Sequence, residues 1–315
     1  MIKKKAGKYK IWKVQALVRH IENSRSNAEF RNLVKELRTR EIPELFEAAE
    51  LLRRYAEDRS SFSPYWDCVY ELRKRESQEV FDTSMQLCKS RRVRDRQLGC
   101  FILGDDVRPK RQNNRGAVDQ LHNMLKTETN PTVLYAILCG LGRAQDPDDT
   151  REIKRIASFR AHVSAKVRLG VVHSLFLRSD RTSVTTLIHL SRDKNVDVRD
   201  WATFYLGFES SGDTPRIRKA LLNRLDDEDC DTRCEALVSL ARRKEPLVRE
   251  AIIRELSLTS PTTMAFEAAA DFEDKSLLPL IDRQIASADE NTDESWLKEA
   301  REAKYRLETG EYPQD

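Results

Sequence analysis

One short phrase recurs along the chain and constrains its fold more than any other feature. A Val or Thr comes first, Arg usually follows it, and a Leu stands eight positions later. The clear copies are N-P-T-V-L-Y-A-I-L-C-G-L-G at 130–142, S-A-K-V-R-L-G-V-V-H-S-L-F at 164–176, N-V-D-V-R-D-W-A-T-F-Y-L-G at 195–207 and C-D-T-R-C-E-A-L-V-S-L-A at 230–241. Their first residues, Val133, Val167, Val198 and Thr232, are 34, 31 and 34 positions apart. A recurring period of this length predicts a chain built from stacked structural repeats.

Each period contains two stretches with the residue spacing of a helix. In the clearest unit, Ile217, Leu221 and Leu225 recur every four positions, which places them on one helical face. Thr214 followed by Pro215 is typical of a helix N-cap and first turn. No segment shows the sustained two-residue alternation of a half-buried strand. The repeat unit is therefore predicted to be a pair of short amphipathic helices, which can bury its apolar face only by stacking on neighbouring pairs.

The phrase, with its Val-Arg and later Leu-Gly, resembles the short HEAT-like repeats that also occur in phycocyanobilin lyases. The resemblance covers roughly residues 60–285 and is clearest at 130–256. It implies an all-α fold, an α-solenoid in which HEAT-like helix pairs form a right-handed superhelix. We predict three regions: a basic N-terminal helical extension at 1–60, a HEAT-like array of about seven helix pairs at 61–290, and an acidic C-terminal capping helix and tail at 291–315.

Charge is distributed unevenly although the net charge is only +4. Residues 1–43 contain twelve Lys or Arg and four Glu, whereas residues 271–315 contain six Lys or Arg and thirteen Asp or Glu. Such asymmetry either orients a partner or reflects two solvated caps. No apolar run approaches the roughly 20 residues of a membrane span. The six cysteines form no CxxC motif, and we expect reduced thiols in a cytoplasmic protein.

Three arginines occupy the position after the first residue of successive units. Arg168, Arg199 and Arg233 are one repeat apart and are expected to form a ladder along the stack. A row of arginines could bind phosphates. The alternative, which we favour, is a structural ladder that pairs with loop acids such as Asp197 and Asp231 and joins neighbouring repeats.

Two further groups of basic residues are candidates for partner binding. One group belongs to a segment that appears inserted at 105–116, and the other lies on second helices that we expect to line a concave surface. The candidates are Arg108, Lys110, Arg111, Arg115, Arg151, Arg155, Arg216 and Lys219. Ordinary solvated charge is the competing interpretation for each of them.

Motifs for catalysis and for metal or cofactor binding are not found. None of the five histidines is followed by Glu, so the His-Glu pairs of the HEAT-like deoxyhypusine hydroxylases are missing. The sequence also lacks HExxH, GxSxG, GxxxxGK[ST] and GxGxxG patterns. We therefore predict no catalytic residue, no metal site and no cofactor.

The resulting functional hypothesis is a non-enzymatic scaffold or adaptor that binds a macromolecular partner, most readily a protein, through the solenoid surface. The alternative is nucleic-acid binding by the basic N-terminal half and the concave strip, since HEAT-like DNA glycosylases hold a duplex on a basic concave face. A lyase-like enzyme ranks below both. The sequence leaves the partner and the oligomeric state open.

Overall fold

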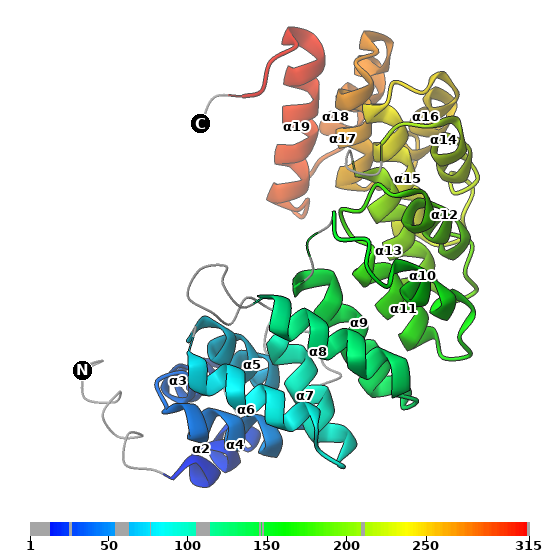
Figure 1. Ribbon diagram of the computed structural model, residues 1–315. Helices are drawn as coiled ribbons and strands as arrows, with labels where there is room; N and C mark the ends of the chain where they lie inside the picture. Colours follow the sequence, from blue (N-terminus) through cyan, green and yellow to red (C-terminus); the bar gives the residue numbers. More distant parts are fainter. Residues whose placement is uncertain are drawn as a thin grey trace. The chain divides into compact units, whose positions relative to one another are not determined.

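The computed structural model describes residues 13–24, 27–53, 63–75, 77–104, 114–144, 146, 148–208 and 212–313. Throughout these ranges the chain forms helices, and no strand occurs in them, as the repeated phrase predicts (Figure 1). The fold is an all-α solenoid. The chain divides into two compact units, unit 1 at Met1–Asp146 and unit 2 at Pro147–Asp315.

Unit 1 consists of three N-terminal helices followed by alternating first and second helices of the repeat. The first helices α5, α7 and α9 pack side by side, and the second helices α6 and α8 pack against them. The helices of unit 1 are α2 (Val14–Glu22), α3 (Asn27–Leu37), α4 (Ile42–Leu51), α5 (Pro64–Lys74), α6 (Gln78–Cys88), α7 (Val93–Leu103), α8 (Asn114–Thr127) and α9 (Pro131–Ala144).

Unit 2 has the same two-layer plan. The first helices α11, α13, α15 and α17 form one layer, the second helices α12, α14, α16 and α18 form the other, and α19 packs on α17 and α18. The helices of unit 2 are α10 (Ile153–Ser158), η2 (Phe159–Ala161), α11 (Ala165–Ser174), α12 (Arg181–Leu190), α13 (Val196–Gly207), α14 (Pro215–Leu222), α15 (Cys230–Arg242), η4 (Pro246–Val248), α16 (Arg249–Leu256), α17 (Thr263–Phe272), η5 (Lys275–Leu277), α18 (Leu278–Ala286) and α19 (Glu294–Thr309).

The repeated phrase corresponds to the buried side of each first helix. The four first residues of the phrase and the four Leu residues eight positions later are all completely buried. They are Val133, Val167, Val198, Thr232, Leu141, Leu175, Leu206 and Leu240. Because these positions are two helical turns apart, they lie on one face of the helix and form the repeating core between the layers.

Glycine at the end of the phrase allows first helices of neighbouring repeats to approach closely. A Cβ atom on Gly104 of α7 would lie 2.4 Å from the Cα atom of Gly140 in α9. A Cβ atom on Gly207 of α13 would lie 2.0 Å from Ser239 Oγ in α15. The first contact is with backbone, so any Cβ at position 104 would push the two helices apart, whereas the hydroxyl of Ser239 could rotate away from a Cβ at position 207.

Side-chain caps fix where several helices begin. Thr214 accepts a hydrogen bond from the N–H of Ile217, which confirms the predicted N-cap before Pro215. Asn195 and Asp229 cap α13 and α15 in the same way. Each cap satisfies one of the free N–H groups in the first turn and fixes the register of the loop before the helix.

Trimming the repeating core should destabilise the protein. We expect Leu206→Ala to lower the free energy of unfolding by about 2–5 kcal/mol, because the fully buried side chain would leave a cavity. Val196→Ala on the same helix is the matched control, since Val196 is 41% exposed and should cost less than about 0.5 kcal/mol. Urea unfolding measures both values, and equal losses would contradict the assigned core.

Candidate functional site

The predicted arginine ladder meets carboxylates and carbonyls, not open surface. Arg168 donates from Nε and Nη2 to the two carboxylate oxygens of Asp193, both at 2.6 Å, and from Nη1 to the carbonyl of His162 at 2.8 Å. Arg199 donates in the same bidentate manner to Asp227 at 2.8 and 2.9 Å. This geometry uses the planar fork of the guanidinium group, which a lysine cannot reproduce.

The pattern extends in both directions along the chain. Arg233 donates from Nε to Glu255 at 3.3 Å and from Nη1 to the carbonyl of Asp227 at 2.7 Å. In unit 1, Arg96 donates to both carboxylate oxygens of Glu128 at 2.8 and 3.3 Å. Arg96 lies in the first helix α7 and binds a carboxylate at the end of the following second helix α8, as the ladder arginines of unit 2 bind carboxylates of the next repeat.

Two aspartates link one repeat to the next in unit 2. The carboxylate of Asp193 accepts from Arg168, and its carbonyl accepts from Arg199 at 2.8 Å. The carboxylate of Asp227 accepts from Arg199, and its carbonyl accepts from Arg233. Each aspartate therefore bridges two successive arginines, and we call this series of bridges the arginine relay.

The prediction that Asp197 and Asp231 pair with the ladder arginines is wrong. Asp197 and Asp231 are exposed and lie in the first turns of α13 and α15. The partners are instead Asp193 and Asp227, in the loops just before those helices. A carboxylate placed before the helix can accept from the arginine of the preceding repeat while it also accepts a loop N–H, as Asp193 does from Asn195 at 2.9 Å.

The relay carboxylates are stabilised in their charged form. Burial alone would raise the pKa of Asp193, but the hydrogen bonds from Arg168 and from the Asn195 N–H outweigh it and hold the pKa below its usual value. The pKa of Asp227 is lowered by the same balance, with Arg199 as the donor. The stabilisation from both groups is therefore present above pH of about 4 and is lost as the pH falls through the lowered pKa values.

Breaking one link of the relay should destabilise the fold. The Arg199 and Asp227 side chains are only 7% and 5% exposed, so Arg199→Gln should cost about 3 kcal/mol, the lower end of the range for breaking a buried pair. Arg192→Gln is the control, because Arg192 is exposed and makes no ion pair with the described residues. Thermal unfolding measures both, and an equal shift in Tm for the two variants would contradict a structural role for Arg199.

Only one of the four basic residues predicted to bind a partner in the 105–116 segment is described by the structure. Arg108, Lys110 and Arg111 lie outside the described residues, and Arg115 is exposed in the first turn of α8. Whether the loop at 105–116 binds a partner stays a prediction.

The four basic residues predicted on second helices do not form one cluster. Arg151 pairs with Asp149 at 2.6 Å, and Arg155 pairs with Glu152 at 2.8 Å, so local acids neutralise both. Arg216 and Lys219 are exposed on α14. Helix α12 packs between α10 and α14 and separates the two pairs. A continuous basic strip is therefore not formed by these residues.

An aromatic cluster that the sequence did not single out lies on the first-helix layer of unit 2. Trp201, at 39% exposure, stacks edge-on against His173 with ring centroids 5.2 Å apart. The hydroxyl of Tyr205 is 3.0 Å from Nδ1 of His173. The cluster consists of His173, Phe176, Trp201, Phe204, Tyr205 and Phe208, which contact one another edge-on or at tilted angles.

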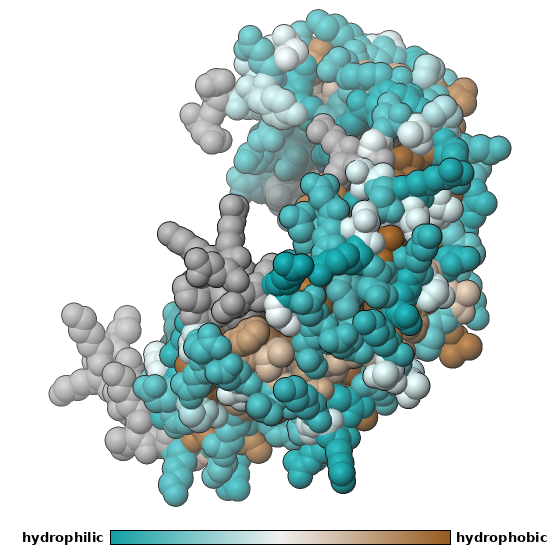
Figure 2. All heavy atoms as spheres, viewed as in Figure 1, coloured by the Kyte–Doolittle hydropathy of each residue, from teal (hydrophilic) through white to brown (hydrophobic). Residues whose placement is uncertain are grey.

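Most of these rings are partly exposed, while the surrounding surface is largely polar. Only Tyr205 is buried, and Phe176, Phe204 and Phe208 are half-buried. The visible face in Figure 2 is mostly hydrophilic, with small separate hydrophobic areas. Five of the six aromatic side chains therefore present part of their ring surface to solvent at one place in unit 2.

Two carboxylates, Asp200 of α13 and Glu235 of α15, lie beside the aromatic cluster. Burial raises the pKa of Asp200 to about 6, and Asp231, Asp229 and Asp197 add to the increase. Burial also raises the pKa of Glu235 to about 7, with Asp200 and Glu267 contributing. Asp200 Oδ1 is buried and has no hydrogen-bond partner among the described residues. We call these two residues the carboxylate pair.

The arginine that lowers the pKa of Glu235 already forms ion pairs with two other carboxylates. Arg242 lowers the pKa of Glu235, but it forms ion pairs with Glu267 and with Asp271, the latter at 3.0 Å. The carboxylate pair thus carries negative charge in a partly desolvated place without an ion pair of its own, which is energetically unfavourable for the isolated protein.

The pH dependence of stability should reveal the carboxylate pair. Both pKa values exceed those of the unfolded chain, about 3.9 for Asp and 4.3 for Glu, so the folded state binds more protons between pH of about 4 and 7. This contribution to stability is complete below that window and is lost as the pH rises through it. The double variant Asp200→Asn/Glu235→Gln should therefore have a higher Tm than the wild type at pH 8, with a smaller difference at pH 5.

Glu290→Gln/Glu299→Gln is the control for this comparison. It removes two negative charges from exposed positions of unit 2 that form no ion pair with other described residues. If the double variant gains the same Tm at pH 5 and pH 8, or if the control gains as much Tm as the double variant, the pKa values of Asp200 and Glu235 are not raised.

The described ranges contain neither a metal site nor a membrane-spanning helix. No group of three or more His, Cys, Asp or Glu there could hold a metal ion. In the same ranges, no helix is both long enough and apolar enough to span a bilayer.

Comparison with known proteins places the chain among helical-repeat proteins. No protein-family model matches it. Protein YibA of Escherichia coli strain K12 is 26% identical over 214 residues, which are 66% of this chain and 75% of YibA. The crystal structure of Escherichia coli YibA has a TM-score of 0.64 at 22% identity and matches 90% of this chain and 99% of that one.

Larger helical-repeat proteins show the same architecture. An importin beta crystal structure has a TM-score of 0.50 at 13% identity, covering 93% of this chain and 49% of importin beta. A structure of Kap95p with RanGDP gives 0.50 at 12% identity, covering 93% of this chain and 46% of that chain. These likenesses concern the fold alone and agree with an all-α solenoid.

Proposed function

We propose that this chain is a non-enzymatic scaffold that binds a protein partner through the first-helix layer of unit 2. The contact surface would consist of the aromatic cluster and the carboxylate pair. The single observation that carries the proposal is the position of Trp201, which is part of a rigid aromatic group and is still partly exposed. Trp and Tyr are enriched among the residues that dominate protein–protein binding energy.

The neighbouring charges indicate what such a partner presents. Burial raises the pKa of both carboxylates, and Asp200 raises that of Glu235 further, so a Lys or Arg from the partner would relieve the cost of ionising them. The aromatic rings would contact the apolar stem of that side chain or an adjacent apolar residue. The proposed partner is therefore a protein with a basic side chain next to an apolar one.

The structural neighbours support this class of function. Kap95p binds RanGDP, which shows that a helical-repeat protein of this architecture can bind a folded protein. The non-enzymatic part of the proposal rests on the sequence, which contains none of the catalytic motifs considered. A reducing compartment such as the cytoplasm completes the proposal, because Cys68, Cys88, Cys100 and Cys234 are buried free thiols.

A binding experiment with matched variants tests the proposal. Partners captured by the wild-type protein from a lysate of its source would be identified, purified and titrated by calorimetry. Trp201→Ala should weaken binding of the specific partner about 30-fold, as expected for a hot-spot residue worth about 2 kcal/mol. Asp200→Asn/Glu235→Gln should weaken binding and reduce its dependence on salt.

Leu247→Ala is the control, because Leu247 is 68% exposed and lies in η4, outside the proposed surface. Its affinity should stay within about twofold of the wild type. Two outcomes contradict the proposal: equal affinities for the Trp201 and Leu247 variants, or sub-micromolar and salt-sensitive binding to duplex DNA that Trp201→Ala leaves unchanged.

A further inference from the structure

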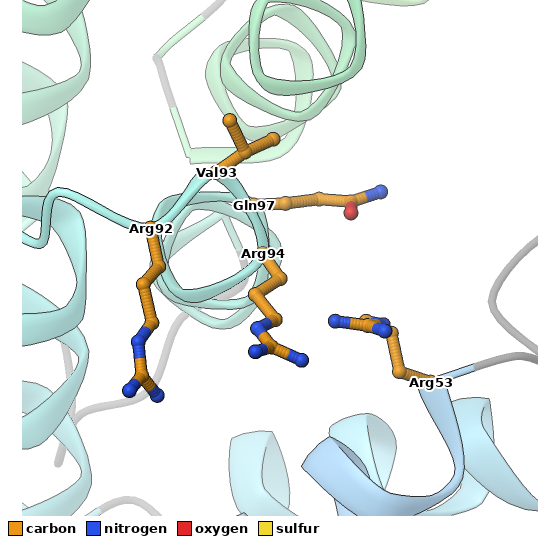
Figure 3. Close-up of a pocket in the computed structure, with 5 residues that line it drawn as sticks. All are labelled: Arg53, Arg92, Val93, Arg94 and Gln97. Carbon is orange, nitrogen blue, oxygen red and sulfur yellow. The ribbon is translucent and has the colours of Figure 1, made fainter.

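A hollow of about 370 Å³ lies at the start of helix α7 in unit 1, away from the residues considered above. It is lined by Arg53, Arg92, Val93, Arg94 and Gln97 (Figure 3). Arg92 precedes α7, and Val93, Arg94 and Gln97 belong to its first turns, while Arg53 follows α4. Figure 3 shows Gln97 and the guanidinium groups of Arg94 and Arg53 extending toward the same open space.

The positive charge around the hollow is only partly neutralised. Glu50 pairs with Arg94 at 3.0 Å and with Arg53 at 3.9 Å. Arg92 is exposed and its side chain makes no ion pair or hydrogen bond with the described residues. Glu50 therefore neutralises part of the charge of Arg53 and Arg94 only, and with Arg92 the lining of this open hollow carries two more positive than negative charges.

Helix α7 adds its own positive end to this arrangement. Its N-cap residue is Arg92, whose side chain has no acceptor and makes no capping hydrogen bond. The corresponding helices α13 and α15 are capped by Asn195 and Asp229. Helices α11 and α17 also begin without a side-chain cap, and Asp95 stands in the first turn of α7, so the helix start adds N–H donors to the hollow rather than a site of its own.

Gln97 supplies an independent indication that something binds in the hollow. The residue is only 7% exposed, yet its amide makes no hydrogen bond with any described residue. The stem of Gln97 is buried, but its amide is not among the enclosed polar atoms and reaches the hollow, where it is available to a ligand. The amide lines the hollow beside Arg94, where its N–H could donate to an oxygen of a ligand.

We propose that this hollow binds the phosphate group of a phosphate monoester. The guanidinium forks match phosphate oxygens in bidentate geometry, and a helix N-terminus and an amide N–H add further donors. The dianionic charge of a monoester matches the two excess positive charges, whereas a phosphodiester carries only one negative charge per phosphate. A volume of about 370 Å³ admits the phosphate and a small organic group attached to it.

The binding of O-phosphoserine and inorganic phosphate to the full chain, measured by calorimetry at low salt, tests the proposal. Arg92→Gln and Arg94→Gln should each weaken binding of O-phosphoserine about 10-fold or more, because each removes charge-assisted hydrogen bonds. Gln97→Met keeps the size and the charge of the site and should weaken binding about fivefold without lowering the Tm.

Arg91→Gln is the matched control. Arg91 is exposed, adjacent in sequence and equal in charge, but it does not line the hollow. Its removal should change affinity less than about twofold. If Arg91→Gln weakens binding as much as Arg92→Gln, the attraction is a diffuse surface field and the proposal is wrong.

Two further arms identify the source of the phosphate. A phosphoserine peptide that binds at least 10-fold more tightly than free O-phosphoserine assigns the site to a phosphorylated protein, and equal affinities assign it to a small phosphorylated molecule. Tighter binding of a short DNA duplex that displaces O-phosphoserine overturns the proposal in favour of nucleic acid, as does the absence of binding by both phosphate probes. Because the residues belong to unit 1, none of these results depends on the protein-binding surface of unit 2.

Discussion

The bidentate contact between an arginine of one repeat and an aspartate before the next is the interaction on which unit 2 depends most visibly. Asp193 accepts from Arg168 through its carboxylate and from Arg199 through its carbonyl. Each link joins two repeats and also fixes the loop that starts a first helix. Apolar burial supplies most of the stabilising free energy, but it has no direction, whereas these hydrogen bonds specify how one repeat registers on the next.

The buried phrase and the arginine relay together use only part of each first helix. The remaining residues of these helices are available for function. The phrase buries its first residue and its Leu, and the relay secures the helix start, so residues such as Asp200, Trp201 and Glu235 have no part in either. Their arrangement is costly for the isolated protein, since burial raises the pKa of both Asp200 and Glu235. Costs of this kind are typical of binding surfaces. The arginine-lined hollow at the start of α7 in unit 1 is the positively charged counterpart: its unneutralised charges are also unfavourable until a ligand of opposite charge binds.

The sequence predicted the features that repeat and missed those that arise between repeats. The buried Val198 and Leu206 followed from periodicity, as did the helix pairs and the alignment of Arg168 with Arg199. The partners of the ladder did not, because two acids on either side of a helix start are equivalent in the sequence and only the loop path distinguishes them. The crowding of Asp200 and Glu235 was equally hidden, since these residues are 35 positions apart. An aromatic count in each repeat would have indicated the Trp201 cluster.

A double-mutant cycle between Arg168 and Arg199 tests the arginine relay most directly. The two side chains do not bond to each other, but both bind Asp193. Urea unfolding of Arg168→Gln, Arg199→Gln and the double variant gives their coupling free energy. The relay predicts a coupling of about 0.5–2 kcal/mol. Loss of Arg168 would already loosen the loop at Asp193, whose carbonyl accepts the hydrogen bond from Arg199. Additivity within about 0.3 kcal/mol would show that the two pairs stabilise their repeats independently and would contradict the relay.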